Sequence, residues 1–141
     1  MDTAPVGVSQ AMVLELIDAS GAATPIDAEL HYDPRDPYAV TAVFHAGSEV
    51  SWTFGRDLLL SGLYEPAGDG DVHVWPCLDA DGRAVVVVEL CSPDGEALVQ
   101  ARSGDLTTFV ERMVQAVQPG RESQHVDVDA AIFAILEAEA A

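Results

Sequence analysis

The period of the hydrophobic pattern changes near residue 102 of the chain. Before this position, short segments of alternating or β-branched residues are separated by turn residues, which is typical of strands joined by hairpins. In residues 26–32, apolar side chains alternate with polar ones, so one side of that strand is expected to be buried and the other wet. The segments that we expect to form strands are 13–17, 26–32, 38–45, 50–54, 72–75, 83–91 and 96–101.

Three segments have the pattern of helices. A leucine-rich segment that begins at Arg56 predicts a short helix stopped by Gly62. Residues 106–117 carry apolar side chains three and four positions apart, which predicts an amphipathic helix that ends before Pro119. A last helix is expected after Asp127 as its N-cap, with one stripe formed by Val128, Ala131, Ile132, Ile135 and Leu136. Strands followed by helices indicate an α+β fold, and 141 residues fit one domain that spans residues 1–141.

The strongest strand signal is the run of four valines in segment 83–91. Valine loses side-chain freedom in a helix and favours the pleated surface of a sheet. Because the apolar residues of this segment point to both sides, we expect the strand to lie in the centre of a sheet or to be buried at an interface. The candidate residues for an oligomer interface are therefore Val85, Val86, Val87 and Val88.

Three adjacent leucines on the short helix are the second candidate for a contact surface. Leu58, Leu59 and Leu60 cannot all face one direction, because successive helical residues are ~100° apart. One of them is expected to reach a second surface, which is either another layer of the same domain or a contact with another protein. Both alternatives stay open at this point.

The charge of the chain is strongly negative. Twenty-four acidic residues stand against six arginines, lysine is absent, and the formal net charge is -18. Nucleic acids and anionic membrane surfaces are bound through clusters of basic side chains, and the six arginines are scattered along the sequence. The charge therefore argues against nucleic-acid partners and favours proteins.

The sequence also argues against membrane insertion and disulfide bonds. The N-terminal residues do not have the basic and apolar regions of a secretory signal, and every apolar run is far shorter than the ~20 residues that span a bilayer. Cys77 and Cys91 do not form a CxxC pair, so we expect both to be reduced. These features predict a cytoplasmic protein.

No sequence motif predicts a catalytic, metal or cofactor site. The chain lacks GxSxG, HExxH, GxGxxG and P-loop motifs, and its histidines do not have the spacing of metal ligands. His73 and Cys77 are the nearest pair, which we interpret as structural. The aromatic residues form a packed core more often than a base-stacking platform when a basic groove is missing. An enzyme or small-molecule carrier would need a deep pocket with convergent polar groups, which the sequence alone does not indicate.

A series of short motifs follows along nearly the whole chain. The first half contains LHYD from residue 30, DPYAV from residue 36, FH from residue 44 and WTFGRDLL from residue 52. The second half contains GDGDV from residue 68, WP from residue 75 and SPDGEA from residue 92. In this order the motifs resemble the SsgA-like proteins of sporulating actinobacteria, and the WP and SP dipeptides indicate the SsgB branch of that family.

The resemblance implies a fold and a function. The implied fold is Whirly-like, with two antiparallel β-sheets packed with a short mid-chain helix and two C-terminal helices, and with assembly into a homotrimer. The implied function is a non-enzymatic adaptor that localises to the division septum during sporulation and recruits or positions FtsZ, the tubulin-like division GTPase. FtsZ and other SsgA-like or septum proteins are the expected partners, and no cofactor is implied.

The resemblance leaves the partner surface open. Besides the leucine turn, the charged loop between the two C-terminal helices is a candidate, through Arg121 and Glu122. The alternative function is that of a Whirly-type protein that binds single-stranded nucleic acid, against which the net charge argues.

Overall fold

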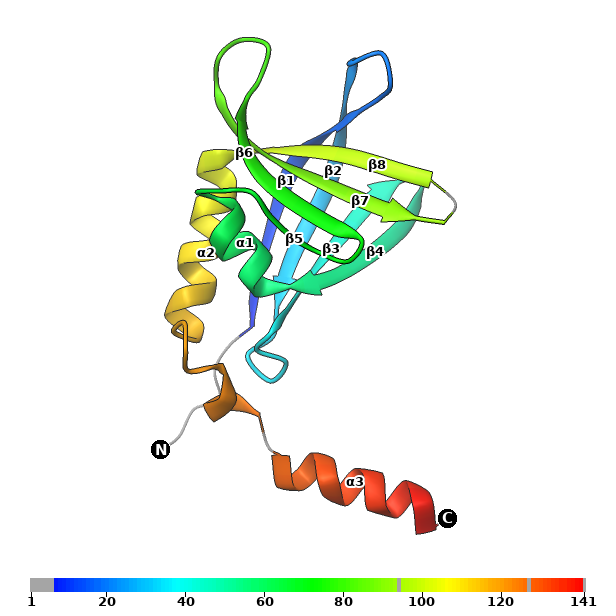
Figure 1. Cartoon of the computed structure of the whole chain (residues 1–141), viewed down its shortest axis with the longest axis vertical. Helices are drawn as coiled ribbons and strands as arrows, with labels where there is room; N and C mark the ends of the chain where they lie inside the picture. The colour runs from blue at the N-terminus through cyan, green and yellow to red at the C-terminus, as the bar shows by residue number, and fades with distance from the viewer. Residues whose placement is uncertain (1–6, 94, 127, 141) are drawn as a thin grey trace.

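One curled, eight-stranded antiparallel sheet forms the body of the protein (Figure 1). The computed structural model describes residues 7–93, 95–126 and 128–140. Along the sheet the strands are ordered β4-β3-β2-β1-β8-β7-β6-β5. Their bounds are β1 (Val8–Ile17), β2 (Ala23–Tyr32), β3 (Ala39–Ala46), β4 (Ser48–Gly55), β5 (Ala67–Asp69), β6 (Val72–Leu78), β7 (Ala84–Ser92) and β8 (Gly95–Arg102).

Two four-stranded meanders are joined into this sheet by β1 and β8. The join pairs Glu15 with Gln100, Leu16 with Val99 and Ile17 with Leu98. The prediction of two packed sheets in a Whirly-like arrangement is therefore wrong, although the α+β class is correct. Alternation along a strand predicts which side chains are buried, but it does not identify the neighbouring strand. The pairing of β1 with β8 brings together residues about 85 positions apart, and no local sequence pattern predicts it.

The three predicted helices are all present, as α1 (Arg56–Gly62), α2 (Ser103–Ala116) and α3 (Val128–Ala140). A 3₁₀ turn, η1 (Glu122–His125), lies between α2 and α3. Figure 1 shows α1 and α2 against the sheet, and α3 away from it. Asp127, the predicted N-cap of α3, lies outside the described residues. The core between the sheet and α2 includes Leu106, Phe109, Val110 and Met113, as the helical pattern predicts.

Pro76 lies inside β6, although the sequence pattern predicts that the strand ends before it. Pro76 pairs with Val86 of β7, and β5 pairs only with residues 72–74 of β6. The last part of β6 is therefore an edge of the sheet. A proline is tolerated there because its missing N–H would have faced away from the neighbouring strand.

Gly62 is required by close packing between α1 and β6. A Cβ atom at Gly62 would lie 2.6 Å from Cβ of Val74, and still closer to its Cγ1. Val74 is fully buried. The sequence pattern correctly predicts the end of α1 here, but the glycine is needed because the helix backbone approaches the sheet.

We expect Gly62→Ala to lower the free energy of unfolding by about 1–2 kcal/mol, because overpacking at Val74 outweighs the better helix propensity of alanine. Urea denaturation measures the change. Gly104→Ala is the matched control, because a Cβ at this glycine of α2 meets no atom within 4 Å. The control is expected to be neutral or slightly stabilising. Equal behaviour of the two variants would contradict the packing argument.

Candidate protein-interaction site

The leucine turn contributes mainly to the core of the protein. Leu58 and Leu59 are buried, and Leu60 is half-buried against the same core. Of the two alternatives that the sequence left open, packing within the domain therefore accounts for Leu58 and Leu59. A role of the leucine turn in partner binding stays a prediction.

The four valines of β7 are placed in the centre of the sheet. Val86 and Val88 contribute to the core, while Val85 and Val87 lie on the opposite side of the strand and are also buried within the single chain. Neighbouring side chains on β6 and β8 provide this cover, since Val87 pairs with Trp75 and with Gln100. The proposed interface role of Val85, Val86, Val87 and Val88 stays a prediction.

Arg56 is the centre of a buried polar cluster that the sequence pattern did not reveal. Its side chain is only 1% exposed. Nε and Nη2 donate hydrogen bonds to Oε1 of Glu122, over 3.2 and 2.8 Å. Nη1 donates to the Tyr32 hydroxyl over 3.1 Å and to the Val117 carbonyl over 2.9 Å. One guanidinium thus links the end of β2, the start of α1 and the loop after α2, and we call these residues the Arg56 cluster.

Tyr32 extends the Arg56 cluster to the turn before β3. Its hydroxyl donates a hydrogen bond to the Pro37 carbonyl over 2.9 Å and accepts one from Arg56. Burial raises the pKa of the Tyr32 phenol, so the hydroxyl keeps the proton that it donates. The arrangement is typical of a fully satisfied buried network, which fixes one geometry of the segments that it joins.

The two candidate residues of the interhelical loop have different environments. Glu122 is buried and ion-paired with Arg56, whereas the neighbouring Arg121 is exposed. The Arg121 side chain makes no hydrogen bond or ion pair with the described residues, while Arg35 and Arg83 pair with nearby aspartates. Glu122 therefore holds the loop in place, and Arg121 is available to a partner.

The only local sequence signal for the Arg56 cluster is an arginine next to apolar residues in the WTFGRDLL motif. Such an arginine is expected to bury its stem and expose its charge more often than to be buried entirely. Its partner Glu122 is 66 positions away, so no spacing rule connects the two. The cluster could not be recognised without the fold.

The interior of the curled sheet does not provide a polar binding pocket. Its cavity has a volume of about 30 Å³, and its lining is entirely apolar, including Phe44, Trp52 and Phe54. The prediction that the aromatic residues form a packed core is confirmed for Phe44, Trp52 and Phe54. Trp75 is instead half-buried on the opposite face of the sheet, where it pairs with Val87. A larger hollow of about 570 Å³ lies beside the turn after β2, where Arg35 donates hydrogen bonds to Asp33 and so lowers the pKa of this carboxyl. Asp33 thus stays ionised, unlike a general acid.

Four large apolar side chains are exposed on α3. Ile132, Phe133, Ile135 and Leu136 each expose half or more of their surface. The stripe predicted from sequence does contain Ile132, Ile135 and Leu136, but in the single chain this stripe does not pack on the sheet. None of the described helices is both long and apolar enough to cross a membrane.

The comparisons with known proteins agree with the motif order. Residues 26–122 match the family described as Streptomyces sporulation and cell division protein, SsgA. The chain belongs to this family. Sporulation-specific cell division protein SsgB of Streptomyces coelicolor is 47% identical over 131 residues, which cover 92% of this chain and 95% of the relative. SsgB of Salinispora tropica is 45% identical, over 94% of each chain. The predicted similarity to the SsgB branch is confirmed.

Solved structures of SsgA-family proteins have the same fold. One of them comes from work on SsgB, under the description that mutations in SsgB correlate to longitudinal cell division during sporulation of Streptomyces coelicolor. Its TM-score is 0.81 and its sequence identity is 43%, and the match covers 89% of this chain and 99% of that chain. The crystal structure of an SsgA-like sporulation-specific cell division protein from Thermobifida fusca has a TM-score of 0.83 and 36% identity, covering 94% and 97%. The SsgA family is thus a family of cell division proteins, and its relatives support a role in sporulation.

Proposed function

We propose that this SsgA-family protein is a non-enzymatic adaptor that binds division proteins at the septum during sporulation. The observation that carries the proposal is the similarity to sporulation-specific cell division proteins over 92% of the chain. The apolar interior supports it, because this cavity has no polar group that could orient a substrate. The net charge of -18 favours protein partners over nucleic acid.

We propose FtsZ as the main partner, with other SsgA-like or septum proteins as further partners. The proposal extends the resemblance noted in the sequence. Arg121 is our candidate contact, because it is an exposed cation without a partner among the described residues, on a loop that the Glu122–Arg56 pair holds in place. A free arginine on a positioned loop suits recognition of a carboxylate on another protein.

We further propose that copies of the chain assemble as a homotrimer. The exposed apolar residues of α3 support self-association, because contiguous apolar surface is rarely left in water on a monomer. Light scattering measures the mass of the assembly. A mass of one chain at all concentrations would contradict the trimer without affecting the proposed binding of FtsZ.

The test of FtsZ recruitment is co-sedimentation of the purified full-length protein with FtsZ polymers at near-physiological salt. We expect the protein to pellet with the polymers or to change their assembly. Arg121→Gln should weaken the interaction several-fold, since exposed charged contacts contribute up to about 1 kcal/mol. Arg83→Gln removes the same charge at an exposed site in the turn between β6 and β7, outside the Arg56 cluster, and is the matched control.

Two results would contradict different parts of this proposal. Absence of co-sedimentation and of any effect on assembly would remove the support for direct recruitment of FtsZ. Binding that is weakened equally by Arg121→Gln and Arg83→Gln would show a general charge effect, and would place the contact away from the interhelical loop.

A further inference from the structure

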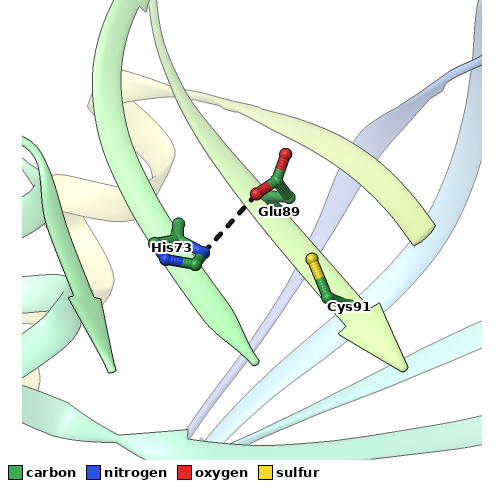
Figure 2. Close-up of side chains that lie close together, drawn as sticks. All are labelled: His73, Glu89 and Cys91. Carbon is green, nitrogen blue, oxygen red and sulfur yellow. Dashed lines mark ion pairs between the residues drawn. The ribbon is translucent and has the colours of Figure 1, made fainter. Parts of the chain in front are cut away.

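Three possible metal ligands of different chemistry meet on β6 and β7. His73 of β6 is directly opposite Glu89 of β7, and Cys91 follows Glu89 by two residues on the same strand. Directly paired residues and residues two positions apart share one face of a sheet. This face is opposite the core, because the alternate residues Val72, Val74 and Leu90 are buried. Figure 2 shows the three side chains projecting from the same side of the two strands.

The separations of the three groups match the size of a metal coordination shell. Nδ1 of His73 lies 3.4 Å from Oε1 of Glu89, and the nitrogen, the carboxylate oxygen and the Cys91 sulfur all lie within 4.8 Å of one another. In a tetrahedral zinc site with bonds of ~2.0–2.3 Å, ligand atoms are roughly 3.3–3.8 Å apart. The histidine and the glutamate already have this separation, and the thiol needs a shift of about 1 Å at most.

The surroundings of the thiol are negatively charged. Glu96 of β8 is paired directly with Cys91, and the Asp71 carbonyl accepts a hydrogen bond of 2.8 Å from the Cys91 N–H. Glu89, Glu96 and Asp71 all act electrostatically on the Cys91 side chain. A negative field of this kind favours a bound cation and disfavours an isolated thiolate.

Gly68 orients the imidazole of His73. It is the residue of β5 that pairs directly with His73, and a Cβ atom at this position would overlap Cδ2 of the ring and lie 3.0 Å from Nε2. The ring therefore packs over the glycine backbone, with its Nδ1 edge toward Glu89. A fixed ring orientation is what a ligating histidine needs from its surroundings.

We propose that His73, Glu89 and Cys91 form a binding site for a divalent cation of the zinc class. A set of one nitrogen, one oxygen and one sulfur ligand suits Zn²⁺, whereas Mg²⁺ and Ca²⁺ prefer oxygen ligands alone. Three protein ligands leave a fourth position for water or a further carboxylate such as Glu96. Glu89 is the residue that joins the other two, because it is ion-paired with His73 and hydrogen-bonded to the Cys91 side chain.

The sequence pattern pointed to a different pair and predicted no metal site. His73 and Cys77 are four positions apart on one strand, which places them ~13 Å apart along β6 at about 3.3 Å per residue. Cys91 is 18 positions from His73 in sequence, and only the pairing of β6 with β7 brings it near. This separation of the two ligands does not match the spacing of any recognised metal-binding motif.

The experiment is a titration of the full-length reduced protein, without a histidine tag, with Zn²⁺ and separately with Co²⁺. We expect saturable Zn²⁺ binding, a rise in the melting temperature, and a thiolate-to-cobalt charge-transfer band. His73→Ala and Cys91→Ser should each weaken Zn²⁺ binding. Loss of a residue that only contacts a metal ligand typically weakens binding ~10–100-fold, and loss of a ligand itself should cost more. Cys91→Ser should also abolish the charge-transfer band.

Three control variants make the result specific. Cys77→Ser keeps the proposed ligands and should bind normally. His31 and His45 both lie near Glu29 and form a second exposed group of possible ligands. The variant His31→Ala changes this second group and should bind Zn²⁺ normally. Gly68→Ala should weaken binding about 10-fold by displacing the His73 ring while leaving all three ligands in the chain.

Circular dichroism shows whether each variant is folded. The proposal would be overturned if the wild type showed no saturable Zn²⁺ binding, if His73→Ala and Cys91→Ser bound as tightly as the wild type, or if His31→Ala abolished binding. None of these outcomes bears on the proposed recruitment of FtsZ, which does not involve these residues.

Discussion

Arg56→Met is expected to lower the free energy of unfolding by about 3–5 kcal/mol, because it leaves Glu122 buried without its partner. The methionine keeps most of the apolar stem, so loss of the guanidinium is the main change. Four hydrogen bonds, to Glu122, Tyr32 and Val117, are removed at once. Urea denaturation followed by circular dichroism measures the loss.

Two further variants test the reason for this loss. Arg35→Met removes an arginine whose pair with Asp33 is exposed, and it should leave the stability unchanged within error. The double variant Arg56→Met/Glu122→Met replaces both charges by apolar side chains and should be more stable than Arg56→Met alone. If Arg56→Met cost no more than Arg35→Met, the buried cluster would not have the role that we assign to it.

The effect of Arg56→Met is also expected to depend on pH. A hydrogen bond from its own backbone N–H, together with Arg56, holds the pKa of the Glu122 carboxyl below its usual value of 4.5. Because the pKa is lowered in the folded state, the pair stabilises the protein above about pH 4.5, and this stabilisation is lost as the pH falls through the folded-state pKa. The difference between wild type and Arg56→Met should therefore shrink in acid.

Phe109→Ala is expected to have a similarly large effect, with a loss of about 3–5 kcal/mol in the free energy of unfolding. Phe109 of α2 is fully buried against the curled sheet, so its removal leaves a cavity next to residues that cannot fully collapse into it. Denaturation in urea measures this change as well.

Phe133→Ala on α3 is the matched control for Phe109→Ala. Its ring is 62% exposed in the single chain, so we expect a change within about 0.5 kcal/mol. Measurements at several protein concentrations separate packing within one chain, which does not depend on concentration, from contacts between copies, which do. A concentration-independent loss as large as that of Phe109→Ala would show that α3 packs on its own chain.

Local pattern predicted most elements of the fold but not their partners. The seven segments with alternating or β-branched residues all became strands, and only β5 was missed, because Gly68 and Asp69 have turn character. The helical period located α2, whose apolar residues are buried. The same reasoning predicted an apolar stripe on α3, but periodicity does not indicate whether any surface covers it.

The candidate sites show the same limit. Leu58, Leu59 and the four valines are hydrophobic and were chosen as contact residues, whereas the fold uses most of them in its core. Conversely, only the tertiary structure brings Arg56 next to Glu122 and His73 next to Cys91. Hydrophobic burial follows local periodicity, but a polar cluster depends on the few atoms that happen to meet, and these belong to distant segments.

The sequence by itself determined the α+β class, most strand and helix positions, the strong negative charge and membership of the SsgA family, because each of these depends on composition, period or motif order. Only the tertiary structure decided that there is one curled sheet and not two, that Arg56 is buried with Glu122, and that three possible metal ligands share one face of β6 and β7. The physical reason is that strand pairing and side-chain neighbourhoods are long-range properties. They are set by the packing of the whole chain, and no local segment carries them.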